Sequence, residues 1–159
     1  SPLQSKSSIQ LDISTNYQFY ISKIIDGSIG GEISIDTLLR NVQGNLVRVE
    51  VCLKIDSLSF EGTREITIIP NVNDASVQFF PKMKFSVPAK LHLIYTSLEL
   101  EKLGFTWNSK ADFAFISEGG IIEPVEYSFC IINWPQQQLR VSNAKLTHFS
   151  RFGFVKKSL

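Results

Sequence analysis

The sequence has few of the residue types on which most protein chemistry depends. Its 159 residues include two cysteines, two histidines and one methionine, and the formal net charge is only +1. A domain that binds nucleic acid through its overall charge usually carries a clear basic excess, so any anionic partner would have to meet a local patch. No apolar run reaches the roughly 18 residues that a membrane-spanning helix needs, so we expect no transmembrane segment.

Recognisable catalytic and ligand-binding motifs are also missing. Only His92 and His148 could act as a general base at neutral pH, and neither accompanies a Gly-x-Ser-x-Gly elbow. Cys52 and Cys130 do not form close ligand pairs with the histidines, as a zinc site requires. The glycine-rich segment 27–31 lacks the lysine and the following helix of a phosphate-binding loop. The sequence therefore predicts a non-enzymatic protein with no metal, cofactor or small-molecule substrate; a site assembled from the two histidines and distant carboxylates is the alternative.

The side chains that are abundant favour β-structure. Twelve phenylalanines and a single methionine indicate a stiff aromatic core, which suits sheets better than a helical bundle. Cys52 and Cys130 lie within apolar, strand-like runs. We interpret them as buried, reduced thiols, with a disulfide between them as the alternative.

Alternation of apolar and polar residues predicts most of the strands. In the segment 46–56, aliphatic residues at odd positions from Val47 to Ile55 alternate with mostly polar ones, which is typical of a half-buried antiparallel strand. A hairpin is predicted near the C-terminus, with arms Val125–Trp134 and Leu139–Phe149. Further strands are predicted at 17–25, 65–69, 76–80, 90–95 and 111–116.

Two segments have features of helices. Residues 34–44 offer Ser34 or Asp36 as a cap, an apolar stripe of leucines and valine, and Gly44 as a stop. Residues 97–104 allow a short helix or a strand, and we favour the helix. The predicted fold class is therefore α+β: an antiparallel β-sheet-rich single domain over residues 10–159 with one or two short helices, preceded by a flexible N-terminal arm, 1–9.

The order of these elements resembles the globular core of rhabdovirus matrix proteins. The matching segments are YQFYISKII at 17–25, SIDTLLRNV at 34–42 and AKLTHF at 144–149. The resemblance implies a structural protein of the virion, host cytoplasm or inner membrane face that self-associates, condenses the viral nucleocapsid and contacts membrane during budding. The lysine-rich arm and proline-rich budding motif usual in that family are missing here. The composition is compatible with a plant-infecting member.

Two stretches supply candidate contact residues. Lysines beside aromatic residues can bind phosphate-rich surfaces such as RNA or anionic lipid headgroups. The candidates for contact with an anionic membrane or a nucleocapsid are Lys82, Lys84, Lys145, Arg151, Lys156 and Lys157. The candidates for self-association, chosen from the arm and from an aromatic pair that a strand would split between its faces, are Leu3, Ile9, Phe79 and Phe80.

These observations leave two non-enzymatic functions open. The first is the matrix-type assembly protein. The second is a plant-virus movement-protein or capsid-like β-domain that binds single-stranded RNA cooperatively and without sequence preference. The predicted partners are further copies of the chain, a viral nucleocapsid or RNA, and a peripheral anionic membrane surface.

Overall fold

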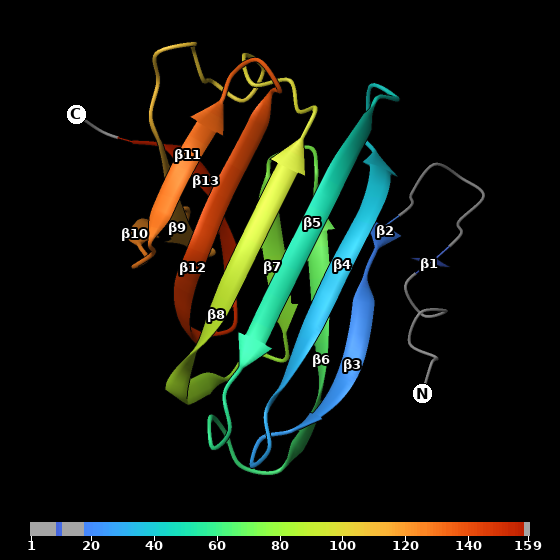
Figure 1. Ribbon diagram of the computed structural model, residues 1–159, viewed down its shortest axis with the longest axis vertical. Helices are drawn as coiled ribbons and strands as arrows, with labels where there is room; N and C mark the ends of the chain where they lie inside the picture. The colour runs from blue at the N-terminus through green and yellow to red at the C-terminus, as the bar shows by residue number, and fades with distance from the viewer. Residues whose placement is uncertain (1–8, 11–17, 158–159) are drawn as a thin grey trace.

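The chain folds into a sandwich of two antiparallel β-sheets, as seen in a computed structural model that describes residues 9–10 and 18–157 (Figure 1). The six-stranded sheet has the order β10 (Ile122–Pro124), β9 (Ala111–Ile116), β13 (Arg151–Lys156), β7 (Ser76–Phe80), β6 (Thr63–Asn71), β3 (Ile21–Asp26). The five-stranded sheet has the order β11 (Phe129–Asn133), β12 (Gln138–His148), β8 (Lys84–Thr96), β5 (Leu46–Ile55), β4 (Gly31–Arg40). A small pair, β1 (Ile9–Gln10) and β2 (Gln18–Phe19), lies outside both.

Burial of one face of each sheet explains why these segments form strands. Along β5 every second residue from Val47 to Ile55 is buried, and the residues between them face solvent. The inner face of the six-stranded sheet is largely aromatic, with Phe79, Phe113 and Phe152 almost fully buried. Removal of this apolar surface from water is the main stabilising contribution to the fold. Strands occupy the predicted segments within the described residues, and the C-terminal hairpin is present, although its first arm begins at Phe129 and not at Val125.

The prediction of an α+β fold is wrong, because no residue in the described part of the chain is helical. The segment 34–44 forms most of β4 and the turn that follows it. Ile33, Ile35 and Leu39 are buried in the alternation of a strand, whereas Leu38 is 57% exposed. The apolar stripe at helical spacing was therefore accidental, and pairing with β5 along ten residues determines the conformation.

The helix favoured at 97–104 is also absent. Consecutive turns occupy this segment, with the N–H groups of Lys102, Leu103 and Gly104 donating to the carbonyl oxygens three residues earlier. Leu98 and Leu100 are buried, so the segment closes one end of the sandwich. Burial of these two leucines accounts for the apolar spacing that resembled a helix.

The glycine-rich segment after β3 is a tight turn. The N–H of Gly27 donates to the carbonyl oxygen of Gly62, and a Cβ at position 27 would come within 2.0 Å of the carbonyl oxygen of Phe60. Glycine is therefore required there for close backbone approach, not for phosphate binding.

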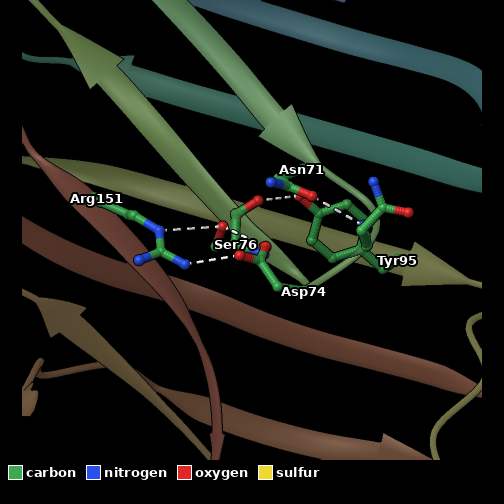
Figure 2. Close-up of polar contacts among 6 residues, drawn as sticks. Asn71, Asp74, Ser76, Tyr95 and Arg151 are labelled. Carbon is green, nitrogen blue, oxygen red and sulfur yellow. Dashed lines mark hydrogen bonds and ion pairs between the residues drawn. The ribbon is translucent and has the colours of Figure 1, made fainter. Parts of the chain in front are cut away.

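A buried tyrosine ties the two sheets together (Figure 2). Tyr95 of β8 is fully buried, and its hydroxyl donates a hydrogen bond to the carbonyl oxygen of Ser76 at the start of β7. The same turn is held by Asp74, which accepts from the Ser76 hydroxyl at 2.6 Å and from Arg151 Nη2 at 2.6 Å. Burial raises the pKa of Tyr95 above its ordinary range, so the phenol stays protonated and remains a donor.

We expect Tyr95→Phe to lower the free energy of unfolding by about 1–2 kcal/mol, because the buried Ser76 carbonyl loses a donor that water cannot easily replace. Urea denaturation followed by fluorescence measures this change. Tyr127→Phe is the matched control, since the hydroxyl of Tyr127 donates to Asp112 at 2.7 Å near solvent. Equal losses in the two variants would contradict the importance of the Tyr95 bond.

Candidate functional site: the outer face of the five-stranded sheet

The C-terminal tail does not present its aromatic residues to a partner. Phe149, Phe152 and Phe154 are all at most 5% exposed and belong to the core. Lys156 ends β13 and Lys157 follows it, with the N–H of Lys157 donating to the carbonyl oxygen of Lys110. These two lysines therefore lie at one end of the sandwich, without the aromatic neighbours that the sequence suggested.

The other predicted cations are dispersed over the molecule. Lys82 pairs with Glu118 at 2.9 Å, and Arg151 pairs with Asp74 at 2.6 Å as part of the turn beside Tyr95. Lys84 begins β8, opposite His148. Lys145 lies on the outer face of the five-stranded sheet, which is the sheet nearer the viewer in Figure 1.

The predicted self-association residues are similarly dispersed. Phe79 is fully buried, so its side chain is not available to a second copy, and Phe80 is half-buried. Ile9 lies in β1, opposite Phe19 of β2. Leu3 and the rest of the predicted arm lie outside the described residues.

A row of three lysines crosses the outer face of the five-stranded sheet. Lys90 on β8 is the cross-strand neighbour of Lys54 on β5 and of Lys145 on β12. Their chain neighbours, among them Leu53, Leu91 and Leu146, point into the core, so all three lysines face outward. With strands about 4.8 Å apart, the row spans about 10 Å.

Like charges directly opposite one another destabilise a sheet, so this row has a cost that the fold itself does not explain. Two of the lysines have a carboxylate partner: Lys90 pairs with Asp56 at 3.6 Å, and Lys145 pairs with Glu126 at 3.7 Å. Lys54 has no ion pair within the described residues, although Glu32 is its neighbour on β4. The row is therefore incompletely neutralised and suits an anion.

His92 lies next to this row, two residues along β8 from Lys90. Its Nδ1 accepts a hydrogen bond from the N–H of Asn143 at 3.3 Å and lies 3.1 Å from Ser142 Oγ. Nδ1 is thus an acceptor, which places the ring proton on Nε2. Burial, together with the positive charges of Lys54 and Arg140, lowers the pKa of His92 below its ordinary value.

A β-bulge in β12 creates this arrangement. The pairing of β12 with β8 shifts between Val141 and Ala144, and Asn143 has a positive φ of 59°. Before the bulge Leu139 and Val141 face the core, and after it Ala144 and Leu146 do. The extra residue thereby turns Lys145 outward, to its place beside Lys90.

An arginine and an aromatic ring extend the face toward β11. The guanidinium of Arg140 lies 5.3 Å from the ring centre of Phe129, within the range of a cation–π contact. Phe129 remains 38% exposed. At the opposite side of the face, Arg48 is neutralised by Asp36 at 2.9 Å and by Glu50 at 3.0 Å. The basic half of the face thus covers β5, β8 and β12.

Sequence reasoning found Lys145 but missed Lys54 and Lys90. Both lysines were visible as polar positions in predicted strands, but which strands lie side by side was not. The one available signal was the change in phase of the apolar residues between Val141 and Ala144, which indicates a bulge and places Lys145 on the polar face.

The two histidines of the sequence do not come together in the structure. His92 and Ser142 meet on the outer face of the five-stranded sheet, where His92 Nδ1 lies 3.1 Å from Ser142 Oγ. A cavity of about 440 Å³ is bordered by Phe115, Phe152 and His148 together with Glu123 and Glu126. His148 pairs with Lys84 beyond a second register shift, and about five residues of β12, or roughly 16 Å, separate it from Asn143, which contacts His92.

Neither metal binding nor the disulfide alternative has support in the described residues. No group of three or more His, Cys, Asp or Glu side chains there could hold a metal ion. Cys52 and Cys130 are both free. Burial raises the pKa of Cys130 to about 12 and also raises the pKa of Cys52, so both remain thiols at neutral pH. Within the same residues, no helix is long and apolar enough to span a membrane.

Comparison of the chain with protein-family models, curated protein sequences and solved structures gave no match.

We expect Lys54→Gln to raise the pKa of His92, because removal of a neighbouring positive charge favours the imidazolium. Titration followed by the NMR signals of the imidazole ring measures the shift. Since the pKa is lowered in the folded state, the unfolded chain binds the proton more readily, and stability falls as the pH drops through the ordinary histidine range. Lys102→Gln, in the turns of residues 97–104, should leave the pKa of His92 unchanged. An equal shift of the His92 pKa in both variants would show that the nearby charge of Lys54 is not its cause.

Proposed function

We propose that this chain is a non-enzymatic β-sandwich that binds single-stranded RNA along the outer face of its five-stranded sheet. The observation that carries the proposal is the row of Lys54, Lys90 and Lys145 in direct register across three strands. Bound phosphates would supply a counter-charge to Lys54, which has no ion pair within the described residues, and would relieve the repulsion along the row.

The surroundings of the row support a nucleic acid over a small anion. The ring of Phe129 and the guanidinium plane of Arg140 offer surfaces on which bases stack without sequence preference. Ser142 and Asn143 place a hydroxyl and an amide group at the bulge, within reach of sugar or base edges. A strand surface of this kind accommodates an extended single strand, whose bases are not paired.

The matrix-type assembly function is the second candidate. Its support is now limited to self-association and to anion binding at this same face. The segment that the resemblance aligned with a family helix, 34–42, forms most of β4, so the element order that suggested the family is not reproduced there. Nucleocapsid condensation, membrane contact and a virion location remain predictions of that resemblance.

The proposal is tested by fluorescence anisotropy with a labelled uridine oligomer of about 16 nucleotides, a length within the range bound by single-strand-binding domains. Contacts from Lys54, Lys90, Lys145 and Arg140 would give a slope of log K against log salt of about −3, at about 0.7 per phosphate contact for a single strand. Lys90→Gln should weaken binding several-fold and reduce the slope by about 0.7.

The matched control is Lys110→Gln, which removes the same charge from the connection between β8 and β9 and should leave binding unchanged. Because a bound phosphate favours protonated His92, affinity should also rise as the pH falls below the ordinary histidine range. Flotation with phosphatidylserine-rich vesicles tests the alternative that the face binds membrane lipid. Vesicle binding without RNA binding would assign the face to membrane lipid, and equal weakening by both variants would overturn the site.

A further inference from the structure

The edges of the two large sheets differ in how they are protected against pairing with other chains. Unpaired edge strands are usually blocked by charges, proline or short length. The edge strand β10 has three residues, including Glu123 and Pro124. The edge strand β3 contains Lys23 and Asp26, and β4 contains Glu32, Asp36 and Arg40.

β11 has none of these protections. Its five residues, Phe-Cys-Ile-Ile-Asn, include no charge and no proline, and all but the last favour β-structure. Its one strand partner in the described part of the chain is β12, so its other side presents free N–H and C=O groups. Ile131 is 50% exposed and Phe129 is 38% exposed, both on the outer face. In Figure 1, β11 is the outermost strand of the front sheet.

The composition of this edge fits a second copy of itself. Antiparallel pairing about a two-fold axis at Ile131 would place Ile131 opposite Ile131 and Phe129 opposite Asn133, with no like charges in contact. On the inner side, half-buried Cys130 would meet Ile132. Pairing with any other edge of the sandwich would bring uncharged β11 against charged or proline-containing strands.

We propose that two copies of the chain associate through antiparallel pairing of β11 with β11, which joins their five-stranded sheets into one continuous sheet. A five-residue edge buries less surface than a permanent dimer requires, so the association is reversible and depends on concentration. This inference does not depend on RNA binding, and it assigns self-association to residues other than Leu3, Ile9, Phe79 and Phe80.

Sedimentation velocity without nucleic acid, from micromolar to millimolar protein, tests the proposal. The wild-type chain should convert from monomer to dimer. Ile131→Lys should weaken dimerisation roughly tenfold or more, because it places two lysines face to face at the axis. The matched control is Leu38→Lys, on the outer face of the opposite edge strand, where the leucine is 57% exposed; it should dimerise like the wild type.

Cysteine cross-linking tests the register independently of whether Ile131→Lys folds. Under mild oxidation, Ile131→Cys should give a covalent dimer, because the two-fold axis brings residue 131 opposite itself. Phe129→Cys should not, since its neighbour across the axis is Asn133. The wild-type chain serves as the background for its own cysteines. A strictly monomeric wild type, equal behaviour of the two lysine variants, or equal cross-linking at both positions would each overturn the proposal.

Discussion

The alternation enforced by the buried inner face of the five-stranded sheet is the constraint on which the candidate site depends. Each strand must place its aliphatic residues inward, and this fixes every side chain on the opposite face. Val51, Leu53, Leu91 and Leu93 are buried at 3% or less, so Cys52, Lys54, Lys90 and His92 have no alternative to the outer face. The lysine row is thus as rigidly positioned as the core, although every member of it contacts solvent.

The bulge in β12 is the departure from strict alternation that shapes the candidate site. Without the extra residue at Ser142–Asn143, Ala144 and Leu146 would turn outward and Lys145 would point into the core. The left-handed conformation of Asn143 is costly for most residues, and asparagine tolerates it better than most. The same insertion supplies the backbone N–H that fixes the His92 ring. The register of β12 on β8, the tautomer of His92 and the outward position of Lys145 therefore all depend on this bulge.

Most strands could be predicted from the sequence because their burial alternates, as in β5 and β9. The helix at 34–44 was predicted wrongly because Leu38 and Leu39 fit both the helical and the strand pattern of apolar residues. Only pairing with β5 decides between helix and strand. The site could not be predicted for a related reason. A lysine row across three strands is a property of strand neighbours, and Lys54, Lys90 and Lys145 are separated in the chain by 36 and 55 residues. The contact surface predicted in the C-terminal tail failed for the opposite reason. Its phenylalanines are adjacent to lysines in sequence but point into the core.

The basic face and the unprotected edge are adjacent, and their geometry connects the two proposals. Lys145 donates its backbone N–H to the carbonyl oxygen of Glu126, five residues before Ile131, whereas Arg140 lies directly opposite Ile131. In a dimer about Ile131, both Arg140 side chains would therefore lie near the axis, and the two lysine rows would be offset by roughly 30 Å along the strand direction. A nucleic-acid strand crossing the junction diagonally would meet one lysine row, two arginines and the second row in turn. Binding to one copy would then raise the effective concentration of the other, so weak edge pairing and weak phosphate contacts would reinforce each other. A dimer of this kind would bind a single strand at two sites at once, without any strong individual contact.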